Sequence, residues 1–288
     1  MSHQPSPLVL VVNTGSSSLK YQLVDPATGA WVGKGLVERI GERGSALRHE
    51  TAAGEVIERA AVLSDHGAAL SIMLDALGED VDVFAVGHRV VHGGSTYREP
   101  VIVDDEVERA IEALVPLAPL HNPASLLGIR EARRLLPDVP HVAVFDTAFH
   151  STMPPEAYTY ALPTELAHAL ELRKYGFHGT SYRYVTRRSA EFLGVPEAEV
   201  NLIVCHLGNG ASMAAIRRGE SVDTTMGVTP LQGLVMGTRS GDIDPAVVFH
   251  LVRVGGLSLD EVDVLLNNVG TYPHQDFEEI TYEDWRNV

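Results

Sequence analysis

Two stretches of the sequence share one pattern, and this repeat limits the folds that the chain can adopt. Residues 8–25, LVLVVNTGSSSLKYQLVD, and residues 202–219, LIVCHLGNGASMAAIRRG, each read as an apolar strand, a polar residue, a glycine-containing turn and a second strand. Asn13 and His206 are 193 residues apart, and so are Gly15 and Gly208. Repetition at a fixed distance predicts two domains built on one plan, with a chance match of two hairpins as the alternative.

Alternating strand and helix patterns place the chain in the α/β class. Strands are predicted at 8–12, 19–24, 83–86, 141–145 and 201–205, and the clearest helices at 68–77, 123–136, 182–193 and 245–254. Proline-rich breaks occur at PLAPLHNP, residues 116–123, and at MPPEAY, residues 153–158. We place a domain boundary at the second break.

The charge balance and the single cysteine narrow the choice of partners and compartment. Asp and Glu total 38 against 22 Lys and Arg, a formal net charge of −16. Nucleic-acid backbones and anionic membranes repel such a chain, although a small anion can still bind in a local basic pocket. Cys205 stands alone, so no intrachain disulfide forms. No stretch approaches the roughly 20 apolar residues that span a bilayer, and we expect a cytoplasmic protein.

The first turn combines groups that suit phosphate oxygens. Gly15 lets the backbone approach a ligand or adopt a positive φ, and successive turn N–H groups can bind an anion. Ser16, Ser17 and Ser18 add hydroxyls, and Lys20 adds a positive charge. The Walker A string is absent, and a simple hairpin turn is the alternative interpretation.

The segment VGHRVVHGG, residues 86–94, offers an arginine and two histidines. His88 and His92 have the spacing of metal ligands on a helix, but the glycine pair and the preceding strand pattern argue against a helix. Arg89 is the better candidate, because a guanidinium at a strand end can grip a carboxylate or phosphate through two parallel hydrogen bonds. An ion pair with an acidic residue of the chain is the equal alternative.

Three further segments carry reactive side chains. Asp146 directly follows the strand at 141–145, where open α/β sheets place functional groups, although it also suits a helix N-cap. His178 lies in KYGFHGTSY, where Thr180 or Ser181 can cap the next helix. Arg239 lies between small residues in MGTRSGDIDP, which suits a second anion clamp. This inventory of positive groups, a carboxylate and glycine turns is what phosphoryl transfer requires.

Seven motifs, taken in order, resemble the acetate kinases from about residue 8 to residue 265. They are VVNTGSSSLKYQL, GHRVVHGG, PLAPLHNP, VFDTAFH, KYGFHGTSY, HLGNGAS and DTTMGVTPLQGLVMGTRSGDIDP. That family belongs to the superfamily of sugar kinases, heat-shock chaperone ATPases and actin. The resemblance therefore implies duplicated actin-like ATPase domains with a ribonuclease H-like core, in agreement with the repeat.

The resemblance also implies roles for individual residues. Asn13 would help to hold Mg²⁺ or Mn²⁺, Arg89 would bind the acetate carboxylate, and Asp146 would be the active-site acid. His178 and Arg239 would stabilise the transition state.

Two implied binding regions complete the site. The groups by the ATP phosphates would be Ser16, Ser17, Ser18, Lys20, His206, Leu207, Gly208, Asn209 and Gly210. The apolar pocket for the acetate methyl would consist of Val91, Leu120, Phe177 and Pro230, with His121 as a further polar member.

The implied reaction is direct in-line transfer of the ATP γ-phosphoryl group to acetate, which gives acetyl phosphate and ADP. Acetate is already ionised at neutral pH, so Asp146 is expected to position metal and charge rather than to remove a proton. The resemblance further implies a homodimer and a place in acetyl-CoA biosynthesis.

Three alternative functions remain open from the sequence. A propionate or butyrate kinase would use the same residues, because one methylene changes discrimination by only about 1 to 3 kcal/mol. A non-catalytic remnant would bind acetate or phosphate without turnover. A metal hydrolase would use His88, His92, His121 and His150.

The end of the chain departs from the family's pattern. After LSLDEVDVLLN, residues 257–267, the sequence continues as NVGTYPHQDFEEITYEDWRNV. The string DVLLNNVG resembles a short-chain dehydrogenase segment, read as a strand and turn before a helix, which suggests a splice within 262–268; a divergent kinase tail is the alternative. The predicted domains are 1–152, a partial second domain at 153–265 and an anomalous tail at 266–288. We expect a second domain of marginal stability and weak or absent kinase activity.

Overall fold

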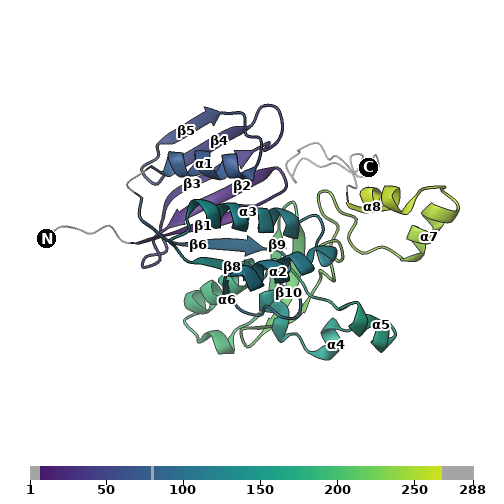
Figure 1. Cartoon of the computed structure of the whole chain (residues 1–288). Helices are drawn as coiled ribbons and strands as arrows, with labels where there is room; N and C mark the ends of the chain where they lie inside the picture. Colours follow the sequence, from purple (N-terminus) through teal and green to yellow (C-terminus); the bar gives the residue numbers. More distant parts are fainter. Residues whose placement is uncertain (1–6, 79–80, 268–288) are drawn as a thin grey trace, which may run out of the picture. The chain divides into compact units, whose positions relative to one another are not determined.

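The computed structural model describes residues 7–78 and 81–267. The chain divides into two compact units, Met1–Ala148 and Phe149–Val288, hereafter unit 1 and unit 2 (Figure 1). Each unit has its own sheet and its own helices.

Unit 1 is built on an eight-stranded sheet of order β5-β4-β3-β2-β1-β6-β8-β7. Its strands are β1 Leu8–Thr14, β2 Ser18–Val24, β3 Trp31–Glu38, β4 Ala46–Thr51, β5 Val56–Ala60, β6 Val83–Val90, β7 Val101–Ile102 and β8 His141–Phe145. Strands β1 to β5 form an antiparallel meander, whereas β1, β6 and β8 run parallel to one another. The carboxyl ends of these three neighbours therefore share one edge of the sheet.

Three helices accompany this sheet, α1 His66–Leu77, α2 Asp105–Ala113 and α3 Asn122–Leu135, with short 3-10 turns at Val115–Leu117 and Ala148–Thr152. Side-chain caps fix where two of them begin. The carboxylate of Asp65 accepts the N–H of Ala68 at 2.9 Å, and that of Asp104 accepts the N–H of Val107 at 2.9 Å. Each cap satisfies a backbone donor that has no partner within its helix.

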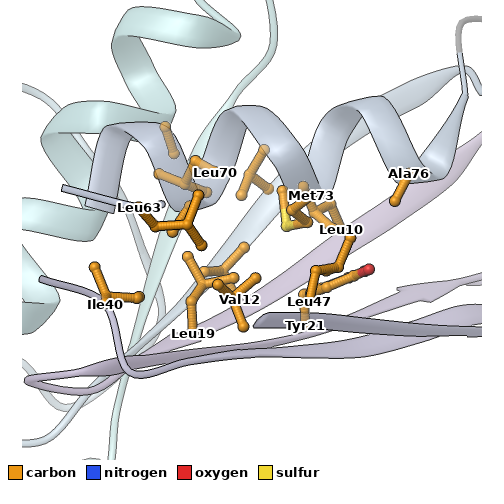
Figure 2. Close-up of a cluster of buried hydrophobic side chains, with 14 of the residues drawn as sticks. Leu10, Val12, Leu19, Tyr21, Ile40, Leu47, Leu63, Leu70, Met73 and Ala76 are labelled. Carbon is orange, nitrogen blue, oxygen red and sulfur yellow. The ribbon is translucent and has the colours of Figure 1, made fainter. Parts of the chain in front are cut away.

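One core cluster of unit 1 lies between α1 and the strands (Figure 2), and a second includes side chains of α2, α3, β6 and β8. Figure 2 shows Leu70 and Met73 of the helix packed over the sheet, whose strands contribute Leu10, Val12, Leu19, Tyr21 and Leu47. Side chains alternate between the two faces of a strand, so Asn13 and Lys20 point to the face opposite this core. The same alternation leaves Val11 exposed.

Helix α3 approaches β1 so closely that one position admits only glycine. A Cβ built on Gly128 would lie 2.1 Å from Oγ1 of Thr14, well inside any tolerable contact. The missing side chain thus lets α3 rest on the strand that carries Asn13.

Unit 2 contains a three-stranded antiparallel sheet of order β11-β10-β9, from β9 Asn201–Leu207, β10 Ala211–Arg217 and β11 Glu220–Thr224. Its helices are α4 Pro155–Tyr158, α5 Thr164–Ala169, α6 Gly179–Leu193, α7 Ala246–Arg253 and α8 Leu259–Asn267, with a 3-10 turn at Glu197–Glu199. Tyr182 of α6 packs with Val204, Ala214 and Ile216 of the sheet. None of the helices within 7–78 and 81–267 combines the length and the hydropathy of a membrane span.

The strands and helices named from the sequence are confirmed, with one exception. Both repeated stretches are antiparallel hairpins, and the bounds of β1 and β2 differ from those of β9 and β10 by the same 193 residues. The strand predicted within 262–268 is wrong, because Leu259–Asn267 is helical. Ser258 and Glu261 form a reciprocal cap at its start, with the Ser258 N–H donating to Glu261 at 2.8 Å and the Glu261 N–H to Ser258 Oγ at 3.2 Å. The rest of the predicted tail lies outside the described residues.

Candidate functional site

Three predicted residues meet at the carboxyl edge of the parallel strands of unit 1. Asn13 is in β1, Arg89 is in β6, and Asp146 directly follows β8. Arg89 donates from Nη2 to Asp146 Oδ2 at 2.6 Å and from Nε to Oδ1 at 3.0 Å, and its Nη1 donates to Asn13 Oδ1 at 3.3 Å. The register of the sheet, not the sequence spacing, brings the three together.

The ion pair between Arg89 and Asp146 is buried on one side only. The Asp146 side chain is 2% exposed, whereas that of Arg89 is 37% exposed. Burial lowers the pKa of Arg89, but the charge and hydrogen bonds of Asp146 outweigh burial and leave that pKa above its ordinary value. The ion-pair alternative is thus what the structure shows, and the guanidinium still has an accessible side.

The turn between β1 and β2 is closed by its own backbone and by a histidine that the sequence analysis missed. The Gly15 N–H donates to the Ser18 carbonyl at 2.7 Å, and His66 Nε2 lies 2.8 Å from the Gly15 carbonyl. Gly15 does not adopt a positive φ. Ser16 and Lys20 are exposed, and Lys20 stands directly opposite Asn13 in the ladder.

The turn after β6 is held by two polar residues outside the predicted site. The Asn122 side chain accepts the His92 N–H and donates to the His92 carbonyl, both at 3.1 Å, and Thr147 Oγ1 accepts the Gly93 N–H at 3.1 Å. Asn122 and Thr147 are buried. Asn122 and Thr147 belong to the motifs PLHNP and VFDTAFH. These motifs indicated the two segments but not the contacts of these residues with the turn.

Three other predicted members occupy different environments in unit 1. Val91 is buried, Leu120 is exposed, and His121 is partly buried at the N-cap position of α3. The site in this unit therefore combines a buried backbone turn with an exposed apolar side chain.

The histidines that the structure describes do not assemble into a metal site. His88 Nε2 lies 2.9 Å from His141 Nδ1, and burial, followed by the charge of His141, lowers the pKa of His88 to about 3. In unit 2, His150 contacts Ser221 Oγ at 2.8 Å and the Phe177 carbonyl at 2.9 Å. Across residues 7–78 and 81–267, no three His, Cys, Asp or Glu side chains are grouped to hold a metal ion. The ligand cluster that the metal-hydrolase alternative needs is thus not formed in that part of the chain.

His178 of unit 2 is held at the start of α6 in a strained backbone conformation. It is the N-cap residue, with φ 60° and ψ 19°, a region that side-chain-bearing residues seldom occupy. The predicted cap from Thr180 or Ser181 is wrong, because α6 has no side-chain cap and Ser181 Oγ instead lies 2.9 Å from His206 Nδ1. Strain at such a residue is typical of functional positions.

Two predicted histidines lie together beside two buried hydroxyls. The rings of His178 and His206 stack with centroids 4.0 Å apart. His178 Nδ1 lies 2.8 Å from Ser212 Oγ, which lies 2.5 Å from the Tyr182 hydroxyl. Ser212 and Tyr182 belong to the motifs HLGNGAS and KYGFHGTSY, yet neither was singled out from the sequence.

The glycine turn after β9 faces Arg239. A Cβ built on Gly210 would lie 3.5 Å from Arg239 Nη1 and 3.5 Å from His178 Nε2. The Gly237 N–H donates to the Asn209 carbonyl at 3.3 Å, which joins the two loops. The structure thus brings His178, His206, Arg239 and the turn into one cluster.

The remaining predicted residues of unit 2 surround that cluster to different degrees. Arg239 Nη1 donates to the Pro230 carbonyl at 3.1 Å, so Pro230 lies directly beside the guanidinium. Phe177 is buried, and Leu207, Gly208 and Asn209 are exposed.

Asn13 and Asp146 have the donor chemistry that Mg²⁺ prefers. Both offer hard oxygen atoms, and Mg²⁺ in phosphoryl-transfer sites is bound through one or two carboxylates together with substrate phosphates. The oxygens of both residues contact the same guanidinium of Arg89. The two residues therefore have the chemistry that would help to hold a divalent ion.

Comparisons with known proteins agree with the resemblance to the acetate kinases. The model of the acetokinase family matches residues 8–271. The chain is 57% identical to the acetate kinase of Streptomyces coelicolor over 266 residues, which is 90% of this chain and 65% of that protein. It thus spans slightly less than two thirds of that relative.

Solved structures show the same fold. The Porphyromonas gingivalis acetate kinase matches with a TM-score of 0.85 and 42% identity over 91% of this chain and 68% of that one. A propionate kinase from Francisella tularensis matches with a TM-score of 0.87, 42% identity and the same two coverages. The predicted α/β, actin-like fold class is confirmed.

The predicted dehydrogenase-like tail is not borne out. The family match continues to residue 271, beyond the stretch 262–268 in which a splice was expected. The string VDVLLN suited both families, and its helical conformation in α8 removes the strand on which the dehydrogenase reading depended.

Proposed function

Because the chain belongs to the acetokinase family, we propose that it transfers the γ-phosphoryl group of ATP to acetate, giving acetyl phosphate and ADP. The family match over residues 8–271 is the observation that carries this proposal. Two separate clusters support it, Asn13–Arg89–Asp146 in unit 1 and His178–Arg239 in unit 2.

Arg89 would bind the acetate carboxylate through its accessible side. An arginine has five N–H donors, and the contacts with Asp146 and Asn13 use one each on Nε, Nη1 and Nη2. The two remaining N–H groups match the two oxygens of a carboxylate. Asp146 would hold the guanidinium in this orientation.

Arg239 and His178 would stabilise charge on the transferring phosphoryl group. Both point toward Gly210, a position without a side chain beside two donors. Arginine stabilisation of a transferring phosphoryl is worth roughly 10³ to 10⁵ in rate. The turns at 15–18 and 206–210, with Lys20, would contact the ATP phosphates through N–H groups and hydroxyls.

A Mg²⁺ ion would be held by Asn13 and Asp146 together with ATP. The ion would neutralise charge on the phosphate oxygens. Since acetate is ionised at neutral pH, Asp146 would serve as a ligand and as the partner of Arg89, and no base is required.

Propionate is the second candidate acceptor, because one structural match is a propionate kinase at the same identity as the acetate kinase. Val91, Leu120, Phe177 and Pro230 would form the pocket for the acyl chain. A pocket of this kind separates acids that differ by one methylene by only about 1 to 3 kcal/mol, so the comparison of kcat/KM on acetate, propionate and butyrate decides the preference.

Other expectations complete the proposal. We propose two actin-like domains at 1–152 and 153–265, a homodimer, and a cytoplasmic location, the last because ATP is the phosphoryl donor. Mass measurement in solution tests the dimer. A role in acetyl-CoA biosynthesis would follow from the product.

Hydroxamate trapping of acetyl phosphate tests the function directly. The chain is incubated with ATP, Mg²⁺ and acetate, and Arg239→Ala is the matched loss-of-function variant, expected to lower kcat by about 10³ or more. Weak or absent turnover of this chain stays a prediction that the same assay measures. Acetate binding by calorimetry with no product above the Arg239→Ala background would favour the non-catalytic alternative.

A further inference from the structure

A chain of two buried hydroxyls lies behind His178, on the side away from the glycine turn. Ser212 and Tyr182 are both fully buried. We propose that Tyr182 and Ser212 are positioning residues that fix His178 as a neutral ring with its proton on Nε2, directed at the phosphoryl site. This deepens the proposed function and rests on it.

The order of hydrogen-bond donors from Tyr182 through Ser212 to His178 follows from which atoms can donate and which can accept. The Tyr182 hydroxyl has one hydrogen, and the Ser212 hydroxyl beside it can either donate or accept. Burial raises the pKa of Tyr182 to about 12, so the hydroxyl keeps its proton. Ser212 Oγ, at 2.5 Å, is the acceptor for that proton, since a buried hydroxyl that donates to nothing is costly.

The serine then determines the tautomer of the histidine. Ser212 Oγ accepts from Tyr182, and its own hydrogen is directed at His178 Nδ1, 2.8 Å away. A nitrogen that accepts a hydrogen bond carries no proton in the neutral ring, so the proton lies on Nε2. The order is therefore Tyr182 O–H to Ser212 O–H to His178 Nδ1.

The other nitrogen of the ring faces the reaction site. His178 Nε2 and Arg239 Nη1 are each 3.5 Å from the Cβ position of Gly210. A phosphoryl oxygen in this space would accept from both the Nε2–H and the guanidinium. The stacking on His206, at 4.0 Å between centroids, and the left-handed backbone at His178 restrict the ring to this orientation.

Histidine-labelled NMR of the whole chain reads the tautomer without any turnover. Long-range ¹H–¹⁵N spectra are expected to show the His178 proton on Nε2 in the parent and a mixture of tautomers in Ser212→Ala. Tyr182→Phe keeps the ring volume and is expected to shift the same balance. Ser181→Ala is the matched control. It removes the α6 hydroxyl that contacts His206, and it should leave the His178 tautomer unchanged.

Turnover supplies the second measurement. Ser212→Ala is expected to lower kcat about tenfold with little change in the KM for acetate, because the histidine would act on the transferring group and not on acetate binding. A parent proton on Nδ1, or a tautomer balance unchanged in both Ser212→Ala and Tyr182→Phe, would overturn the proposal. A parent without kinase activity that shows the Nε2 tautomer, disturbed in both variants, would favour the non-catalytic alternative over the proposed function and would still support the roles of Tyr182 and Ser212.

Discussion

The two hairpins, β1–β2 and β9–β10, have strands of equal length but different pairing. In the first, Thr14 stands opposite Leu19, so four residues separate the last pair; in the second, Leu207 stands opposite Ala211, and three residues separate them. A slip of one residue turns a side chain to the other face of a strand. The difference in turn length thus changes the face of the sheet to which each polar side chain points.

Asn13 and His206 show the consequence. Asn13 stands opposite Lys20 on the face away from α1, whereas His206 stands opposite Ser212 on the face that packs against Tyr182 of α6. The sequence offset of 193 matches strand bounds but not side-chain directions. The first hairpin supplies the accessible side-chain oxygen of Asn13. The second supplies the His206 ring, which stacks on His178.

The two hairpins also support different electrostatics. The first belongs to a charged cluster with a buried carboxylate, and the second to a cluster of imidazoles and hydroxyls beside one arginine. If this contrast is correct, perturbing the first cluster should mainly change stability, and perturbing the second should mainly change the rate.

Arg89→Ala is expected to have the largest effect on stability. It leaves the Asp146 carboxylate, 2% exposed, without its charged partner, which should lower the free energy of unfolding by about 3 kcal/mol. Arg48→Ala is the matched control, because it removes an exposed pair with Glu58 from the same sheet and should cost under about 0.5 kcal/mol. Urea unfolding followed by circular dichroism measures both, and equal losses would show that the buried pair does not stabilise unit 1.

Acid should destabilise unit 1 through its buried histidines. Burial lowers the pKa of His88 to about 3, below the value of about 6.5 in the unfolded chain. As the pH falls below 6.5 the unfolded state binds the proton first, so stability is lost between about pH 6.5 and pH 3. His88 alone should remove about 2 kcal/mol between pH 7 and pH 5.

The quantity to compare is the slope of the free energy of unfolding against pH, not the free energy at one pH. His88→Gln should flatten that slope in urea titrations between pH 7 and pH 5. His49 and His141, whose pKa values are also lowered by burial, should leave a residual slope. Parallel slopes for the parent and His88→Gln would rule out His88 as the source.

Alanine substitutions at Gly208 and Gly210, in the turn between β9 and β10, should distinguish an effect on kcat from an effect on stability. A methyl at Gly210 would lie between Arg239 and His178, whereas one at Gly208 would contact only the Gly210 carbonyl, at 3.5 Å. Neither residue has a positive φ, so both variants should unfold within about 0.5 kcal/mol of the parent. Gly210→Ala is expected to lower kcat at least tenfold relative to Gly208→Ala, and equal rates would separate this turn from the phosphoryl site.

From the sequence we could name several residues that the structure places side by side, such as Arg89 and Asp146, but not their pairing. Arg89 and Asp146 lie 57 residues apart, and their contact depends on the register between β6 and β8. The direction of His206 depends on a turn one residue shorter than its counterpart. Ser258 and Glu261 carried a capping signal that outweighed the strand-like run after them. Long-range register and buried hydroxyls leave no local pattern to read.

Lys20→Gln should have the smallest effect and sharpen the role of the first turn. Lys20 is exposed, so the free energy of unfolding should change by less than about 0.5 kcal/mol. If its ammonium contacts a phosphate, the KM for ATP should rise, and the rise should shrink as salt screens the charge. Lys34→Gln is the control on the neighbouring strand β3, where Lys34 already pairs with Glu50 at 3.3 Å. Equal KM values for the two variants at low and high salt would place the phosphates away from Lys20 and leave the turn as a hairpin alone.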